Sequence, residues 1–360
     1  MVYNLLTFPV TLLFVGNAFL HLYYAIKLNR KYPKTQNFYN SIIVFLLWIV
    51  AGLVYPLFYT RDDEYVRFHQ SLALNILCVY APLLIFLFLF FQYNVVLKTN
   101  PELRKERTID NFYKKYNKLN PESTDKKYSI KTDLHRKVFH LLPPLIIIIL
   151  WIFATYAWEG ILGADKVWGL SGREFGTFII ITIGYTGILL FAAIDYVRLS
   201  FIFEKRTIYH LFPGFLSSIL ARTIKRSEVY DFAKPVGMVL SYVPIFFLPF
   251  EIFASAALIS TIGDAAASIC GIAFGKRRFP KKSHKTIIGY LAGFLASFCV
   301  GLFTLWIFGQ SLSFLNIVVI SSSGAGVFLI IDLLSLKIDD NILNPILSAV
   351  VMMMVFTILR

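Results

Sequence analysis

Stretches of about twenty apolar residues recur along most of the chain, and they constrain the fold more than any other feature. A helix of roughly 20 residues crosses about 30 Å of hydrocarbon and makes its backbone hydrogen bonds internally. A soluble core could not hide a chain of 360 residues that is 57% hydrophobic. The sequence therefore predicts an all-α, polytopic membrane protein with about ten transmembrane helices, near 5–26, 40–59, 71–97, 138–157, 174–197, 235–250, 252–273, 287–308, 314–335 and 342–359.

Charge is distributed unevenly between the connecting segments. Basic residues dominate 27–39, 98–137, 198–234 and 274–286, whereas 60–70 and 158–173 are acidic or nearly neutral. Lys and Arg concentrate in the cytosolic loops of membrane proteins, so this alternation predicts a cytosolic basic face and both chain ends outside. The excess of 35 Lys and Arg over 21 Asp and Glu indicates a lipid bilayer and anionic headgroups or a phosphorylated substrate as partners, and no nucleic acid.

The one long polar segment, 98–137, divides the chain. It separates an N-terminal three-span region (1–97) from a seven-span region (138–360), and we expect it to be a cytosolic basic linker. A second polar segment, 199–226, mixes aromatic and basic residues, a pattern typical of a helix that lies in the membrane interface.

Asp264 is the most unusual residue of the seventh span. It lies about eleven residues, or roughly 16 Å of helix, before the loop at Gly275. An ionisable side chain at such depth is expensive, and we expect it to be paired, to line a wet cavity or to be neutral. Its small neighbours would let a backbone or a ligand approach closely. The alternative is a helix-packing face with a buried, hydrogen-bonded aspartate.

The hairpin that follows has the residue types that bind a polyphosphate. Cations, glycines and hydroxyl groups precede the next helix, whose N-terminus would favour an anion. The spacing is not that of a Walker A loop, because Gly271 and Gly275 are one residue too close and no Ser or Thr follows Lys276. Such a loop also occurs as a simple consequence of cytosolic topology. The candidate nucleotide-binding residues are Gly275, Lys276, Arg277, Arg278, Lys282, Lys285, Thr286 and Gly289.

Three further polar clusters are predicted on the same face. Each could be a snorkelling or capping group by itself, but together they can supply carboxylates for Mg²⁺, which bridges to phosphate oxygens. Asp264, Asp332 and Asp340 are the candidate catalytic and metal-binding residues. The clusters are Arg136, Lys137 and His140 at the start of the fourth span, Asp195 and Arg198 at the end of the fifth, and Asp332, Asp339, Asp340 and Asn341 around the last turn.

Several of these motifs together resemble the family of dolichol kinases, phytol kinases and CTP-dependent diacylglycerol kinases. The central match runs from Gly263-Asp264-Ala265-Ala266-Ala267-Ser268 through Gly271, Gly275-Lys276 and Lys285-Thr286-x-x-Gly289. Flanking matches are Arg136-Lys137-x-x-His140, Asp195-x-x-Arg198, and Asp340-Asn341 with Pro345. The similarity covers roughly 130–360. Many relatives have Glu, Gly and a hydroxyl residue where this chain has Ile288, Gly289 and Tyr290, and many have Glu where this chain has Asp332.

This resemblance implies a kinase that transfers the γ-phosphoryl group of CTP to a membrane lipid alcohol, dolichol or another polyprenol, with Mg²⁺. It implies that Asp264 is essential, as general base or Mg²⁺ ligand, and that the basic hairpin holds the nucleotide. Arg198, His140 and Lys137 would help to orient the phosphates. The membrane would be the endoplasmic reticulum in a eukaryote and the plasma membrane in a prokaryote, with the active face cytosolic.

Two other functions fit the same residues. A cytidylyltransferase that makes a CDP-activated lipid would use the same basic loop and metal with a lipid phosphate as acceptor. A non-catalytic transporter or scaffold would instead line a pathway with Asp264 and Asp332.

Overall fold

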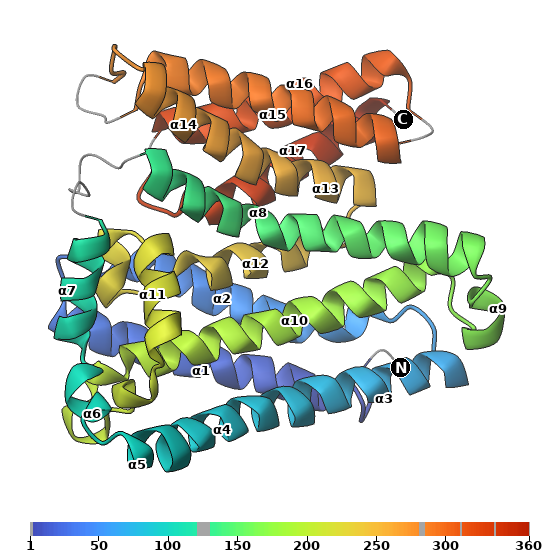
Figure 1. The fold of residues 1–360 in the computed structure, drawn as a ribbon. Helices are drawn as coiled ribbons and strands as arrows, with labels where there is room; N and C mark the ends of the chain where they lie inside the picture. The colour runs from blue at the N-terminus through green and yellow to red at the C-terminus, as the bar shows by residue number, and fades with distance from the viewer. Residues whose placement is uncertain (1–2, 121–129, 281–284, 310–311, 335, 360) are drawn as a thin grey trace. The chain divides into compact units, whose positions relative to one another are not determined.

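The computed structural model describes residues 3–120, 130–280, 285–309, 312–334 and 336–359, and this part of the chain is helical with no strand beyond an isolated bridge (Figure 1). The predicted all-α membrane fold is confirmed. Within the described residues, nine helices are long and apolar enough to cross a membrane. They are Phe8–Lys31, Phe38–Phe58, Glu64–Thr99, Asp133–Ile161, Gly172–Ile202, Phe250–Phe274, Ile287–Phe308, Phe314–Leu334 and Asp340–Leu359.

The sixth predicted span is shorter than a full crossing. Helix α12 covers Lys234–Ile245, and its 12 residues rise only about 18 Å. Pro244 lies within its last turn, and the chain turns before helix α13 begins at Phe250 after Pro249. Proline removes a backbone donor and clashes with the preceding turn, so these two prolines delimit the helix although the segment is apolar throughout.

The chain folds into two compact units, whose boundaries differ from those of the predicted regions 1–97, 98–137 and 138–360. Unit 1 comprises Met1–Leu119 and Ile146–Val236, and unit 2 comprises Asn120–Leu145 and Gly237–Arg360. The N-terminal spans therefore pack with the later helix α10 (Gly172–Leu199). Their core includes the rings of Phe14, Trp48 and Tyr185, and the Tyr185 hydroxyl donates to the carbonyl of Ala51 at 2.8 Å.

The remaining helices of unit 1 are α1 (Phe8–Lys31), α2 (Phe38–Val54), α3 (Glu64–Leu74), α4 (Ala81–Phe91), α5 (Leu97–Thr99), α6 (Leu103–Glu106), α7 (Ile109–Leu119), α9 (Asp165–Trp168) and α11 (Gly214–Thr223). The segment 199–226, predicted as an interfacial helix, forms short 3₁₀ turns followed by α11. The long helix from Glu64 to Thr99 includes two π-helical stretches, Asn75–Tyr80 and Gln92–Val96.

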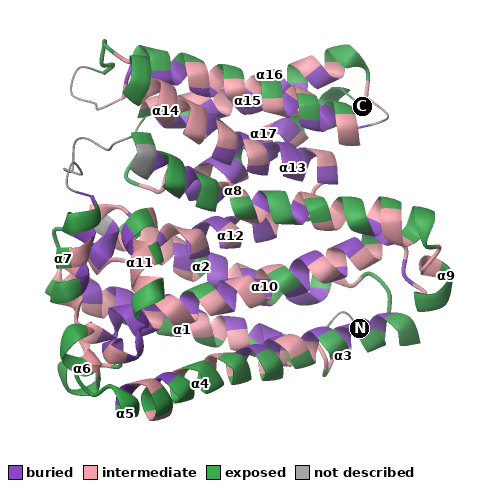
Figure 2. Ribbon diagram, viewed as in Figure 1, coloured by how far each residue is buried: buried purple, intermediate pink, exposed green. Residues whose placement is uncertain are grey.

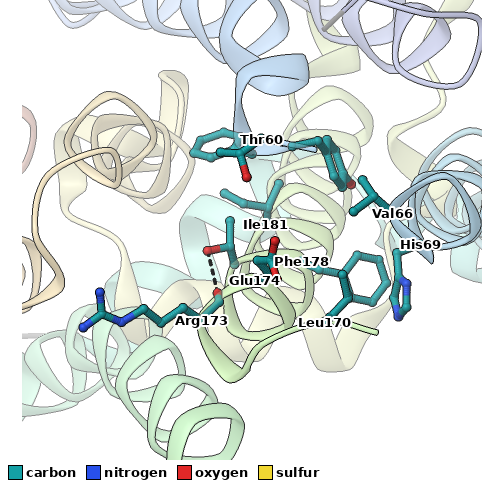
Figure 3. A pocket seen from close by; sticks show the side chains of 11 residues that line it. Thr60, Val66, His69, Leu170, Arg173, Glu174, Phe178 and Ile181 are labelled. Carbon is teal, nitrogen blue, oxygen red and sulfur yellow. Dashed lines mark hydrogen bonds between the residues drawn. The ribbon is translucent and has the colours of Figure 1, made fainter. Parts of the chain in front are cut away.

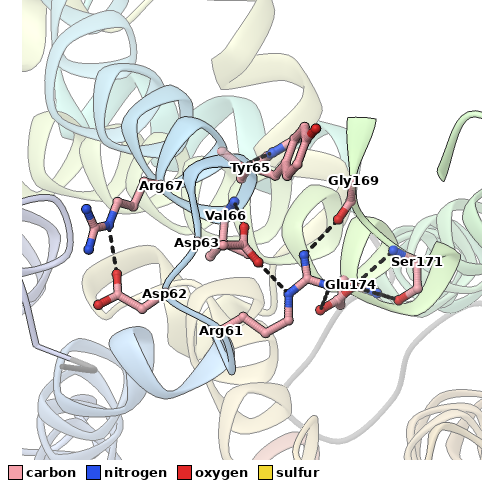
Figure 4. Close-up of polar contacts among 10 residues, drawn as sticks. Arg61, Asp62, Asp63, Tyr65, Val66, Arg67, Gly169, Ser171 and Glu174 are labelled. Carbon is pink, nitrogen blue, oxygen red and sulfur yellow. Dashed lines mark hydrogen bonds and ion pairs between the residues drawn. The ribbon is translucent and has the colours of Figure 1, made fainter. Parts of the chain in front are cut away.

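Hydrogen bonds and ion pairs fix the start of α10 (Figure 4). Ser171 and Glu174 form a reciprocal capping box, and Glu174 also pairs with Arg61, which donates to the carbonyl of Gly169. Nearby, the hydrogen bond from Arg67 lowers the pKa of Asp62 to about 2. A capping box satisfies two helix-terminal donors, so this end of α10 is well defined.

Unit 2 packs four segments closely: α13–α14 (Phe250–Leu258 and Asp264–Phe274, joined by the π-helical Ile259–Gly263), α15 (Ile287–Phe308), α16 (Phe314–Leu334) and α17 (Asp340–Leu359). Small residues allow the approach: a Cβ added at Gly293 would lie 2.9 Å from the Cβ of Ala267. The first part of α8 (Ile130–Ile152) belongs to this unit as well.

Burial in both units follows the pattern of a membrane protein (Figure 2). Large apolar side chains of α4, such as Phe86 and Phe90, are exposed, whereas hydroxyl groups such as Ser297 and Ser321 are fully buried in unit 2. Lipid is as apolar as a hydrophobic core, so exposed apolar faces are stable there and polar groups are directed inward.

Candidate active site

Four polar side chains in the first turns of α8 are buried. Asp133, Arg136, Lys137 and His140 are buried, while Val138 and its apolar neighbours on the helix are exposed. Their spacing of three and four residues places these four on one helical face. Arg136 donates to Asp133 at 2.6 Å, so the charges of these two side chains compensate each other on this face.

Asp264 lies where a π-helical stretch returns to α-helix. Ile259–Gly263 is π-helical, and such bulges are frequent at functional sites. The Asp264 carboxylate pairs with the ammonium group of Lys137, whose side chain is only 4% exposed, and 19% of the Asp264 side chain remains exposed. Of the three environments expected for this deep carboxylate, the structure shows a paired one.

A second lysine–carboxylate pair lies close by. Lys285 donates to the Asp332 carboxylate at 2.6 Å and to the Asp332 carbonyl at 2.9 Å. Burial acts to lower the pKa of Lys285, but Asp332 and Asp340 raise it above its ordinary value overall, so the ammonium stays charged. Asp332 is within electrostatic range of both Asp264 and Asp340. Unit 2 thus brings together the three predicted catalytic carboxylates.

The hairpin between α14 and α15 is held by backbone pairing. Phe279 N–H donates to the Lys285 carbonyl and Ile287 N–H to the Arg277 carbonyl, both at 3.1 Å. Tyr290 donates to the Phe279 carbonyl at 2.9 Å, and Thr286 caps α15 by accepting from Gly289 N–H at 3.2 Å. Thr286, predicted to donate to a phosphate, therefore uses an oxygen lone pair for the helix cap.

The glycines of the hairpin are required for packing. A Cβ at Gly275 would overlap the carbonyl oxygen of Gly271 and the hydroxyl of Thr286, and one at Gly289 would lie 2.8 Å from the Ala267 carbonyl oxygen. The sequence suggested that these glycines serve nucleotide binding. Their surroundings in the structure give them a role in the close approach of α14 and α15.

The basic side chains predicted to bind the nucleotide fall into three groups. Lys276, Arg277 and Arg278 are exposed and form no ion pair with another described residue. Lys137 and Lys285 are paired with carboxylates, and Lys282 lies outside the described residues. The hairpin therefore offers three exposed positive charges to a polyanion.

No group of three or more His, Cys, Asp or Glu side chains is arranged to hold a metal within the described residues. Oxygen donors in unit 2 include the carboxylates of Asp264 and Asp332, each of which is paired with a lysine. Mg²⁺ is commonly held by one or two carboxylates together with substrate phosphates and water. Two such carboxylates could hold Mg²⁺ only together with phosphate oxygens or water.

Arg198, which was expected to orient phosphates, is bonded to protein groups instead. Its side chain is fully buried in unit 1, and its N–H groups make five hydrogen bonds, two to Asp195 and one each to the carbonyls of Glu228, Val229 and Asp231. Asp195 also accepts from Ala233 N–H at 2.9 Å. A guanidinium has five N–H donors, so none remains for a phosphate. The pair fixes the segment 228–233.

Two features escaped the sequence analysis. Asp133 and Arg136 have the same Asp-x-x-Arg spacing as Asp195 and Arg198, so the sequence could have predicted this second ion pair. Unit 1 also has a cavity of about 130 Å³ between the start of α3 and the start of α10, lined mainly by apolar and aromatic side chains (Figure 3). Arg173 lines it but directs its guanidinium away, and Glu174 is already paired with Arg61, so we assign no chemistry to this cavity.

The pair of Lys137 and Asp264 can be tested by its coupling energy. Lys137→Met should destabilise unit 2 by about 1–3 kcal/mol. This loss is smaller than that for breaking a fully buried ion pair, because the Asp264 side chain is partly exposed. Adding Asp264→Asn should recover most of that loss, with a coupling of about 1–2 kcal/mol in unfolding free energies measured in mixed detergent micelles. Additive effects would contradict the pairing.

Gly275→Ala should weaken the packing of α14 on α15. The added methyl group overlaps the Thr286 side chain that caps α15 as well as the Gly271 carbonyl oxygen of α14 itself, so a loss of about 1–3 kcal/mol is expected. Gly326→Ala in α16 is the matched control, because a Cβ there meets nothing within 4 Å and should be neutral or slightly stabilising. Equal thermal unfolding of the two variants would refute the packing role.

In comparisons with known proteins, no family model, no curated protein and no solved structure matches the chain.

Proposed function

We propose that this integral membrane protein is a CTP-dependent lipid-alcohol kinase that transfers the γ-phosphoryl group to the hydroxyl of dolichol or another polyprenol. The observation that carries the proposal is the pairing of Asp264 with Lys137 and of Asp332 with Lys285 within unit 2. Both pairs belong to elements that adjoin an exposed basic hairpin. The motif resemblance from Gly263 to Gly289 gives the reaction class.

Phosphoryl transfer requires positioning and charge neutralisation more than covalent chemistry. Lys276, Arg277 and Arg278 would hold the phosphate chain, because they are exposed cations at one turn of the hairpin. Lys137 and Lys285 would exchange their carboxylate partners for phosphate oxygens when the nucleotide binds. His140, on the same face of α8 as Lys137, would orient phosphates.

Asp264 would act on the lipid hydroxyl. As a general base it would take the hydroxyl proton while the oxygen attacks the γ-phosphorus and CDP departs; as a Mg²⁺ ligand it would hold the nucleotide instead. Asp332 and Asp340 are further candidate oxygen donors in unit 2. Mg²⁺, when bound with CTP, would neutralise the charge that develops on the phosphate oxygens.

Labelled nucleotides test the reaction. Purified protein should transfer label from γ-labelled CTP, and not from α-labelled CTP, to a polyprenol in detergent or vesicles. Transfer of α-label to a lipid phosphate would identify a cytidylyltransferase. Failure of CTP with Mg²⁺ to raise the unfolding temperature would support a transporter or scaffold instead.

The proposed site is cytosolic, because the basic segments 98–137 and 274–286 adjoin it in sequence. The membrane would be the endoplasmic reticulum in a eukaryote and the plasma membrane in a prokaryote. Cysteine labelling tests the cytosolic orientation. In intact cells, a membrane-impermeant thiol reagent should fail to label a cysteine engineered at Lys276 if the site is cytosolic.

A further inference from the structure

Tyr290 is a buried tyrosine in the first turn of α15, with 6% of its surface exposed. Its backbone N–H donates to the Thr286 carbonyl at 3.1 Å, so the residue belongs to the regular start of the helix. Its side chain extends back to the hairpin, where the hydroxyl donates to the Phe279 carbonyl at 2.9 Å. The tyrosine therefore connects a long helix of unit 2 to the first arm of the hairpin, residues 275–280.

Backbone hydrogen bonds hold this arm in place. The Phe279 side chain is 52% exposed, so its ring is a weak anchor. Both backbone polar groups of Phe279 are engaged, because the N–H donates to the Lys285 carbonyl at 3.1 Å and the carbonyl accepts from Tyr290. The first of these bonds joins the two arms of the hairpin to each other, whereas the second joins the first arm to α15. The Tyr290 hydroxyl thus fixes the arm relative to the helix.

The cations proposed to bind the nucleotide lie next to this contact. Lys276, Arg277 and Arg278 belong to the first arm, and their side chains are exposed. Lys285 is on the other arm, and its ammonium group is within electrostatic range of Tyr290. One side chain therefore adjoins the cations of both arms.

We propose that Tyr290 is a positioning residue for the nucleotide: its hydroxyl holds the first arm of the hairpin against α15, so that the cations of both arms face one polyphosphate. This role rests on the proposed function, because it requires a nucleotide that binds to the hairpin. The apparent affinity for a ligand falls with the fraction of protein molecules in the binding-competent conformation. A fixed arm therefore raises the affinity although the tyrosine itself does not contact the reacting atoms.

Tyr290→Phe tests this role, because the variant keeps the buried ring and loses the hydroxyl alone. Loss of one neutral hydrogen bond changes an equilibrium by about fivefold. The full-length variant in detergent should therefore bind CTP with Mg²⁺ about fivefold more weakly in calorimetric titration. The KM for CTP should rise by a similar factor, while kcat at saturating CTP stays within about twofold, because bound nucleotide then holds the arm in place.

Hydrogen exchange measures the arm itself, with no nucleotide present. The Phe279 and Ile287 amides, which donate across the hairpin, should exchange about fivefold faster in Tyr290→Phe than in the unaltered protein. Tyr242→Phe is the matched control, since Tyr242 is a buried tyrosine of unit 2 that lies in α12. This control should leave both the CTP affinity and the exchange of the two amides unchanged.

The possible failures of the two proposals can be told apart. The positioning role is wrong, and the proposed function unaffected, if the unaltered protein binds CTP and Tyr290→Phe binds it as tightly, or if exchange of the two amides is unchanged. A lower kcat with an unchanged KM also contradicts the positioning role, because it would indicate an effect on the chemical step. If the unaltered protein binds no CTP at millimolar concentration, the proposed function itself fails, and the positioning role fails with it.

Discussion

Asp264→Asn should lower kcat for transfer of the γ-phosphoryl group by at least about 10³-fold without unfolding the protein. Asparagine has nearly the shape of aspartate and can still accept a hydrogen bond from Lys137, so the helical packing should survive. It has no negative charge with which to take a proton or bind Mg²⁺. Initial rates with γ-labelled CTP and a polyprenol, together with circular dichroism, measure both parts of the prediction.

Asp62→Asn is the matched control for this substitution. Asp62 is an exposed carboxylate of unit 1 that pairs with Arg67, and the variant should retain full activity. More than a tenth of the original activity in Asp264→Asn would refute the assigned role.

Residual activity of Asp264→Asn also separates the two roles left open for this carboxylate. Loss of a general base should abolish the acidic limb of the dependence of kcat on pH. Loss of a metal ligand should instead raise the Mg²⁺ concentration needed for half-maximal rate and leave that limb in place.

The membrane fold was predictable because its main signal is local. Each long helix is an apolar run whose length alone indicates a crossing. The segment 235–250 is apolar throughout, but its prolines shorten the helix to Lys234–Ile245. Division into two compact units depends on helix packing, which no apolar run specifies, so the grouping of α10 with the N-terminal spans was not foreseen.

The residues of the candidate site were predictable, but their partners were not. Spacing within one helix correctly suggested that Asp195 and Arg198 face each other. Lys137 and Asp264 are separated by 127 residues, and only the tertiary fold brings them together. The role of the glycines was not predicted for the same reason, because it depends on tertiary contacts. Gly275 lies so close to Gly271 and Thr286 that there is no room for a side chain.

Arg198→Met should destabilise unit 1 by about 3–5 kcal/mol, the largest effect on stability that we expect from a single substitution. The change leaves the buried Asp195 carboxylate without its cation and three backbone carbonyls without their donor. Arg198→Lys should also destabilise, because an ammonium has three donors and cannot reproduce the planar fork. Arg222→Met, at an exposed arginine of α11, is the control and should be near neutral.

Unfolding free energies in mixed micelles and the KM for CTP together decide what Arg198 does. A structural arginine predicts a large loss of stability in both Arg198 variants, with an unchanged KM in the protein that remains folded. A phosphate ligand predicts the opposite: normal stability and a KM raised tenfold or more. Because all five N–H groups of Arg198 already have acceptors within unit 1, the first outcome is the expected one, and the second would require the segment 228–233 to give up those acceptors when CTP binds.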